Sequence, residues 1–113
     1  MSEFATRTTA TGITVITPSG RLNMVAAPAL RKQLHALVDG GHHRVVVELN
    51  AVELIDSSGL GALISGLKAA RQAGGDLRIA APTRQVTAVL ELTNLNRVLR
   101  SHPSADSAFD DTP

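Results

Sequence analysis

Residues 44–61 read RVVVELNAVELIDSSGLG and predict a strand followed by a glycine-rich turn into a helix. The first part, 44–49, is a continuous apolar run of strand length. Such runs are typical of strands that are covered on both faces, as in a parallel sheet with helices packed on it. After a short turn at Asn50 and Ala51, residues 52–55 carry the chain to Asp56 and a pair of serines.

The segments on either side alternate between strand-like and helix-like patterns. Residues 13–17, ITVIT, are β-branched throughout and read as a strand, and FATRTT before them is expected to pair with it antiparallel at the edge of the sheet. Further strands are predicted at 77–81 and 97–99, and helices at 28–38, from the serine pair to Gly74, and at 84–92. A helix, a glycine pair and a strand occur twice in that order, which fits two successive crossover units of an α/β sheet.

Length and composition exclude several classes of protein. The chain has 113 residues, a length typical of one compact domain, and only Phe4 and Phe109 are aromatic, so aliphatic side chains must supply the core. The net charge is +1 and the basic residues form no run, so neither a nucleic acid nor a membrane is expected as a partner. The absence of cysteine excludes disulfides and thiolate catalysis. Without a signal peptide or a membrane span in the sequence, a cytoplasmic protein is expected.

The paired serines at 57 and 58 allow several interpretations. Serine is a good N-cap, and the glycines that follow would let the turn bend tightly. A serine nucleophile is not favoured, because no histidine is near in sequence and the nucleophile elbow G-x-S-x-G is absent. A nucleotide cradle lacks the third glycine of the dinucleotide fingerprint and the Gly-Lys-Ser/Thr of a P-loop. His42 and His43 lack a third ligand by spacing, so no metal site is expected.

A serine that accepts a phosphoryl group is the remaining interpretation. Phosphate adds about −1.5 to −2 charges, and the free N–H groups and positive dipole end of a helix N-terminus can accommodate it. Spacing alone does not choose between this hypothesis and a simple cap.

Two stretches resemble a known family. VELIDSSGLGALISGLKAARQAGGDLRI, at 52–79, resembles the bacterial STAS domains, the anti-sigma factor antagonists, in which D-S-S/T-G-L-G follows a central strand. PSGRLNMVAAPALRKQL, at 18–34, resembles the family's G-x-L-D segment and first helix. The resemblance covers about residues 10–100. It implies a mixed β-sheet of four to five strands with an N-terminal β-hairpin, and about four helices mainly covering one face.

The resemblance implies one STAS domain over 1–113, with a core at about 4–100. Residues 101–113 would form a short terminal helix or a frayed acidic tail, in which Ser104 is a candidate cap and Phe109 a candidate anchor. No enzymatic activity, catalytic residue, cofactor or metal is implied.

The function implied by the resemblance is partner switching in transcription regulation, as in a stress response. The unmodified protein would bind an anti-sigma factor that has serine-kinase activity and thereby free the sigma factor. Phosphorylation of Ser57, the first serine after the aspartate, would end the complex, and a serine phosphatase of the PP2C type would reverse it. Glu53 and Asp56 lie near Ser57, so phosphorylation would concentrate negative charge on one patch.

The partner-binding residues carried over from the family lie in two segments. They are Asn23, Met24, Asp56, Ser58, Gly59, Leu60 and Gly61. Asn23 is a departure, because the family usually has an acid at this position. Asparagine can keep the geometry of a turn but removes a charge. Met24 is either a contact for the partner or part of the core.

Two other functions are compatible with the sequence. STAS folds also serve as regulatory subunits or domains of anion transporters and lipid ABC systems. The intact D-S-S-G-L-G motif favours the sigma-factor switch over this alternative. Nucleotide binding by the domain itself would require affinity for ATP in the absence of a partner.

Overall fold

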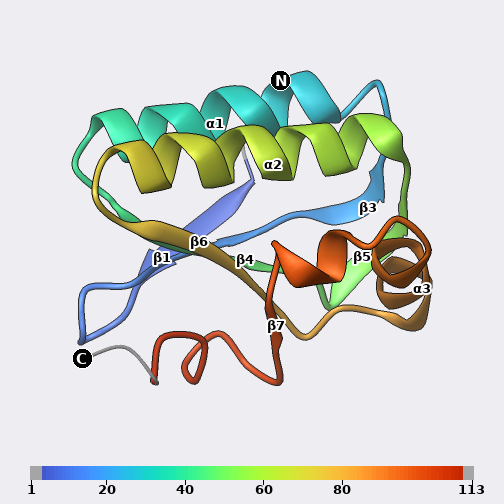
Figure 1. The fold of residues 1–113 in the computed structure, drawn as a ribbon. Coiled ribbons are helices and arrows are strands. Elements are labelled where there is room, and N and C mark those ends of the chain that lie inside the picture. The colour runs from blue at the N-terminus through green and yellow to red at the C-terminus, as the bar shows by residue number, and fades with distance from the viewer. Residues whose placement is uncertain (1–3, 111–113) are drawn as a thin grey trace.

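A five-stranded mixed sheet lies at the centre of the computed structural model, which describes residues 4–110 (Figure 1). The strand order is β1-β2-β4-β6-β7, in which β1 is antiparallel to β2 and all other neighbours are parallel. The strands are β1 (Ala5–Thr8), β2 (Thr14–Thr17), β4 (Arg44–Glu48), β6 (Asp76–Ala80) and β7 (Ser101–His102). The predicted N-terminal hairpin, the edge position of its first strand and the parallel crossover units are confirmed.

A second, two-stranded sheet was not predicted. It pairs β3 (Ser19–Leu22) with β5 (Ala51–Ile55) in parallel. The sequence Pro18-Ser19-Gly20 reads as a stop, and Gly20 does have a positive φ of 75° with a register shift beside it. The chain after this stop nevertheless forms strand β3, because the backbone of β5 supplies hydrogen-bond partners for it. The strand before the serine pair is therefore β5 of the small sheet, and not a strand of the central sheet.

The helices number three within residues 4–110, together with one short 3-10 helix, where about four helices were expected. They are α1 (Ala27–Asp39), α2 (Ser57–Gln72), α3 (Arg84–Leu92) and the 3-10 helix η1 (Leu95–Arg97). Helices α1 and α2 lie side by side on one face of the central sheet (Figure 1), whereas α3 packs against β5. The predicted strand at 97–99 is wrong, because Arg97 ends η1 and residues 98–99 form a turn, and the last strand is β7.

The main core lies between the central sheet and helices α1 and α2. Val45 and Val47 of β4 belong to it, while Val46 between them belongs to a second cluster on the opposite face. All three valines are fully buried. The alternation follows from the two-residue period of a strand and confirms that β4 is covered on both faces.

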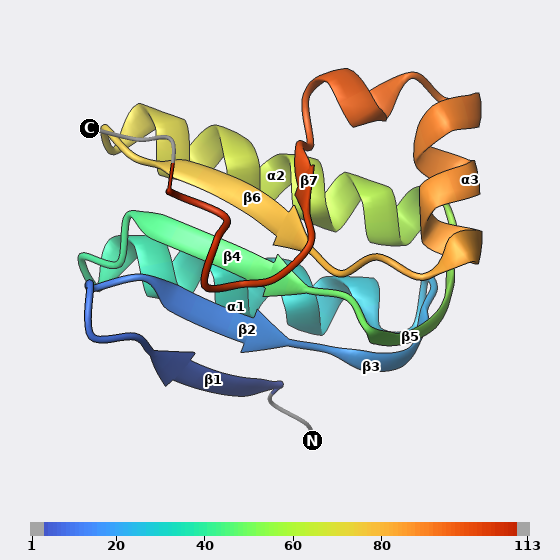
Figure 2. The same ribbon diagram turned by 90° about the horizontal axis from the view of Figure 1, so that it is seen from below.

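The second face of the sheet is covered by the C-terminal segment, which crosses it as a strap (Figure 2). Ala105, Ala108 and Phe109 of this segment are buried against the sheet. The guanidinium group of Arg78 lies 4.3 Å from the ring centroid of Phe109 and donates a hydrogen bond of 2.8 Å to the carbonyl oxygen of Ala108. The predicted anchor at Phe109 is thus confirmed. The frayed tail or terminal helix is wrong for 103–110, which forms packed turns, and 111–113 lie outside the described residues.

Candidate functional site

The turn between β5 and α2 is held at a fixed position by backbone and side-chain hydrogen bonds. The Asp56 N–H donates to the carbonyl oxygen of Leu22, at 3.2 Å. The Asp56 carboxylate accepts a bond of 3.0 Å from the N–H of Gly59, and its carbonyl oxygen accepts another of 3.0 Å from Leu60. Asp56 is therefore the N-cap of α2. The sequence analysis considered a serine as the N-cap of this helix, and that interpretation is wrong. Aspartate is an equally good N-cap residue.

Helix α3 clamps the strand that leads into this turn. The Ile55 N–H donates to Gln85 Oε1 at 2.9 Å, and Gln85 Nε2 donates to the carbonyl oxygen of Ile55 at 3.4 Å. Thr83 Oγ1 donates to the carbonyl oxygen of Val52 at 3.1 Å. These bonds satisfy backbone groups of β5 that β3 does not pair. The start of α2 is thus supported from two sides.

The two serines differ in their surroundings. Ser57, the first residue of α2, is exposed, whereas Ser58 is partly buried and lines a groove between α1 and α2. Neither hydroxyl forms a hydrogen bond with another residue in the range 4–110. Ser57 therefore presents an accessible hydroxyl in the first turn of a helix whose first N–H groups have no intrahelical acceptor.

The two glycines of the motif, Gly59 and Gly61, have different surroundings. A Cβ atom on Gly59 would lie 2.3 Å from the backbone oxygen of Leu22 and 2.8 Å from Cγ1 of Ile55, so only glycine lets these segments meet. Leu60 is buried in the core, and Gly61 is exposed with open space around its Cβ position. The close approach of backbone at Gly59, and not a tight bend, accounts for the first glycine.

The loop before α1 lies against the start of α2. Asn23 Oδ1 accepts hydrogen bonds from the N–H groups of Val25 and Ala26, at 3.0 and 3.3 Å, so asparagine keeps the turn as expected. Met24 is 72% exposed, and its assignment to the core is wrong. Val25 is 82% and Leu54 is 40% exposed, and sequence reasoning missed both.

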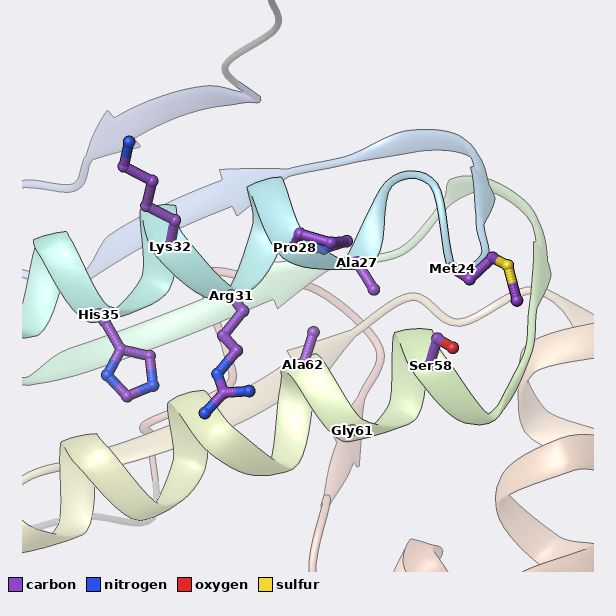
Figure 3. Close-up of a pocket in the computed structure, with 9 residues that line it drawn as sticks. All are labelled: Met24, Ala27, Pro28, Arg31, Lys32, His35, Ser58, Gly61 and Ala62. Atoms are coloured by element: carbon purple, nitrogen blue, oxygen red, sulfur yellow. The ribbon is translucent and has the colours of Figure 1, made fainter.

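The groove between α1 and α2 adds further residues to the site. Figure 3 shows Arg31 and His35 reaching from α1 toward α2, with Met24 and Ser58 at the end where α2 begins. Arg31 and His35 were not predicted as site residues, because they belong to the polar side of a helix whose neighbour is set only by the fold.

Other chemistry was also considered from the sequence. Within residues 4–110 no three His, Cys, Asp or Glu side chains are grouped so that they could hold a metal ion. His42 bonds Thr14 Oγ1 through its Nδ1 at 2.9 Å, and His35 bonds Ser65 Oγ through its Nε2 at 2.6 Å. No helix in the described part of the chain has the length and apolar character required to cross a membrane.

Comparison with known proteins places these features in a family. The family model described as "STAS domain" matches residues 5–108. A Bordetella bronchiseptica protein named "Putative anti-sigma factor antagonist BtrV" is 31% identical over 101 residues, which cover 87% of each chain.

Solved structures agree with the fold. A Thermotoga maritima protein described as a "putative anti-sigma factor antagonist" is 27% identical, with a TM-score of 0.87 over 96% of this chain and 92% of its own. An anti-sigma factor antagonist from Mycobacterium paratuberculosis is 27% identical, with a TM-score of 0.84 over the same shares. The Bacillus protein SpoIIAA, 15% and 17% identical in its unphosphorylated and phosphorylated forms, shares the fold, with TM-scores of 0.71 and 0.72.

Proposed function

The chain belongs to the STAS domain family, and from this premise we propose that it is an anti-sigma factor antagonist switched by phosphorylation of Ser57. The unphosphorylated form binds an anti-sigma factor that is also a serine kinase, and the sigma factor is released. A PP2C-type phosphatase restores the active form. The chain is a regulator and substrate in this cycle, and not an enzyme, as the names of its relatives support.

The observation that carries this proposal is the exposed hydroxyl of Ser57 at the start of α2. A kinase can reach it without unfolding any part of the chain. The phosphate would lie at the positive end of the helix dipole, where a negative charge is favourable by about 0.3–1 kcal/mol at an exposed position. The modified domain therefore remains folded.

The switch acts on the surface rather than on the fold. Asp56 caps α2, and Gly59 and Leu60 are held in the core, so a phosphate on Ser57 has no internal contact to break. A partner that fits the neutral hydroxyl would instead meet a dianion. Unfavourable charge pairs in an interface cost several kcal/mol, and each 1.4 kcal/mol is about tenfold in affinity. Consistent with this, the SpoIIAA fold is shared by both of that protein's forms.

The partner-binding residues proposed around Ser57 fall into two groups, those that are exposed and those that are buried or hold the turn. Met24 and Gly61 are exposed, and Asn23 and Ser58 are partly so, which suits direct contact. Val25 and Leu54 are exposed apolar residues close in sequence to Met24 and to Asp56, and we include them in the proposed contact surface. Gly59, Leu60 and the capping Asp56 contribute by holding the serine in place.

The test is to incubate the chain with ATP and each purified anti-sigma kinase of the source organism, and to measure its intact mass. One phosphate is expected on the wild-type chain and on Ser58→Ala, and none on Ser57→Ala. Modification of Ser57→Ala to the wild-type extent contradicts the assignment. Modification by none of the kinases contradicts the proposed function and favours a transporter regulator.

A further inference from the structure

The groove between α1 and α2 has a volume of about 580 Å³ at the end nearest Ser57. This volume is within the range of about 300–1,000 Å³ that is typical of small-molecule pockets, so volume alone does not name the occupant. The lining residues are Met24, Ala27, Pro28, Arg31, Lys32, His35, Ser58, Gly61 and Ala62. Past His35 a second hollow of about 460 Å³ continues along the same two helices. An elongated seam of this kind suits a stretch of polypeptide better than a compact metabolite.

The groove has an uneven charge. Arg31 and Lys32 line the part nearest Ser57, where none of the described lining residues is an Asp or Glu, whereas the second hollow has one residue of each sign, Lys68 and Asp39. Arg31 forms no ion pair with any carboxylate in the range 4–110 and reaches into the groove, whereas Lys32 points away from α2 (Figure 3). The start of α2 lies at the same end of the groove, but the Asp56 carboxylate that caps it offsets the positive end of the helix dipole, so Arg31 is the main positive group there. The charge of the groove therefore favours an anionic occupant.

The floor of the groove is apolar and open. Ala27, Pro28 and Ala62 contribute small side chains, and nothing lies within 4 Å of a Cβ atom built on Gly61. Met24, with its flexible and polarisable side chain, stands exposed at the end of the groove. An apolar side chain can therefore be seated over Gly61.

The walls of the groove are fixed before anything binds. The His35–Ser65 hydrogen bond joins α1 to α2 between the two hollows. Leu34 of α1 packs so closely on α2 that a Cβ atom on Gly66 would lie 2.8 Å from its Cδ1. A preformed groove loses less conformational entropy on binding.

From this geometry we infer that the groove binds an acidic segment of the partner protein, with one apolar side chain seated over Gly61 and carboxylates at Arg31. The inference rests on the proposed function and names the chemistry of the partner at that site. It also explains why phosphorylation expels the partner, since a dianion on Ser57 repels an acidic segment bound beside Ser58. Asn23 fits the same account, because an aspartate there would repel that segment.

The first test measures the dissociation constant for the anti-sigma factor that binds the wild-type chain. Arg31→Glu is expected to weaken binding about tenfold, because one attraction becomes a repulsion. Arg97→Glu makes the same charge change on η1, outside the groove, and is expected to remain within twofold. Gly61→Leu fills the floor without a charge and is also expected to weaken binding about tenfold. Equal affinities for Arg31→Glu, Gly61→Leu and Arg97→Glu overturn the inference.

The second test needs no anti-sigma factor. The full chain is titrated with a peptide of alternating glutamate and leucine, and with its lysine counterpart, while backbone amide resonances are followed by NMR. The acidic peptide is expected to shift Gly61 and Ala62, and the basic peptide is expected to shift neither. Shifts located elsewhere, or equal shifts with both peptides, overturn the inference.

The two proposals can fail separately. If Ser57 is phosphorylated as proposed but Arg31→Glu binds the kinase normally, the groove assignment is wrong and the switch stands. If no anti-sigma factor binds the chain but the acidic peptide shifts the groove resonances, the groove assignment stands and the proposed function is wrong.

Discussion

Adding one methyl group at either of two glycines in the first turns of α2 should change stability in opposite directions. At Gly61 the new Cβ meets nothing within 4 Å. Glycine is about 0.8–1.0 kcal/mol less favourable than alanine inside a helix, so Gly61→Ala should stabilise the chain by nearly that amount.

At Gly59 the same methyl group has no space. Its Cβ would lie 2.3 Å from the Leu22 oxygen, whereas real Cβ atoms essentially never approach closer than 3.0 Å. The backbone at the end of β3 must move, and the hydrogen bond from the Asp56 N–H to that oxygen is disturbed. Overpacking costs about 1–3 kcal/mol and the hydrogen bond about 1 kcal/mol, so a net loss of about 2 kcal/mol remains after the helix propensity is gained.

Urea unfolding followed by far-UV circular dichroism measures both effects. The two variants should differ by about 3 kcal/mol, which is about 12 °C in melting temperature for a domain of this size. Gly66→Ala should lie between them, because its methyl group meets the movable side-chain ends Leu34 Cδ1 and Leu77 Cδ1. A Gly59→Ala variant as stable as Gly61→Ala refutes the close approach of β3 to α2.

Three further changes test the supports of the site and the strap. Asp56→Ala should lower the free energy of unfolding in urea by about 1 kcal/mol, because it removes the cap on the Gly59 N–H. Asp56→Asn should cost less than half of that. An equal cost for both variants would argue against the cap. Asn23→Ala should lower the free energy of unfolding by about 1 kcal/mol, because it removes two hydrogen bonds to backbone N–H groups. Asn23→Asp should keep most of this stability. An alanine variant as stable as the wild type would contradict the turn. Phe109→Ala should cost about 3 kcal/mol and increase amide hydrogen exchange in β6, whereas unchanged exchange would mean that the strap does not protect the sheet.

The sequence alone was sufficient to predict the helices and strands that have a strong hydrophobic or β-branched pattern. The β-branched run at 13–17, the continuous apolar run at 44–49 and the two long helices were placed within one or two residues, because their patterns reflect which face is buried. Phe109 was a candidate anchor from the sequence, and the structure buries it against the sheet.

The elements that were missed depend on neighbours distant in sequence. β3 is mostly exposed and contains a glycine with positive φ, so only its pairing with β5 makes it a strand. β7 has two residues, and its position is set by Ile79 and Ala80 of β6.

Within the site, the motif identified the turn but not the role of each residue. Asp56 rather than a serine caps the helix, and Ser58 lines the groove beside α1, because of how β3 and α1 lie against the start of α2. The contribution of Arg31 depends on how α1 lies against α2, which no local pattern encodes.

The affinities of the phosphorylated and unmodified chain for one anti-sigma factor decide whether Ser57 is the switch. The chain is phosphorylated to completion on Ser57, and isothermal titration calorimetry gives its dissociation constant beside that of the unmodified chain. The account predicts a loss of at least about a hundredfold, or about 2.8 kcal/mol. Dissociation constants that agree within threefold would contradict it.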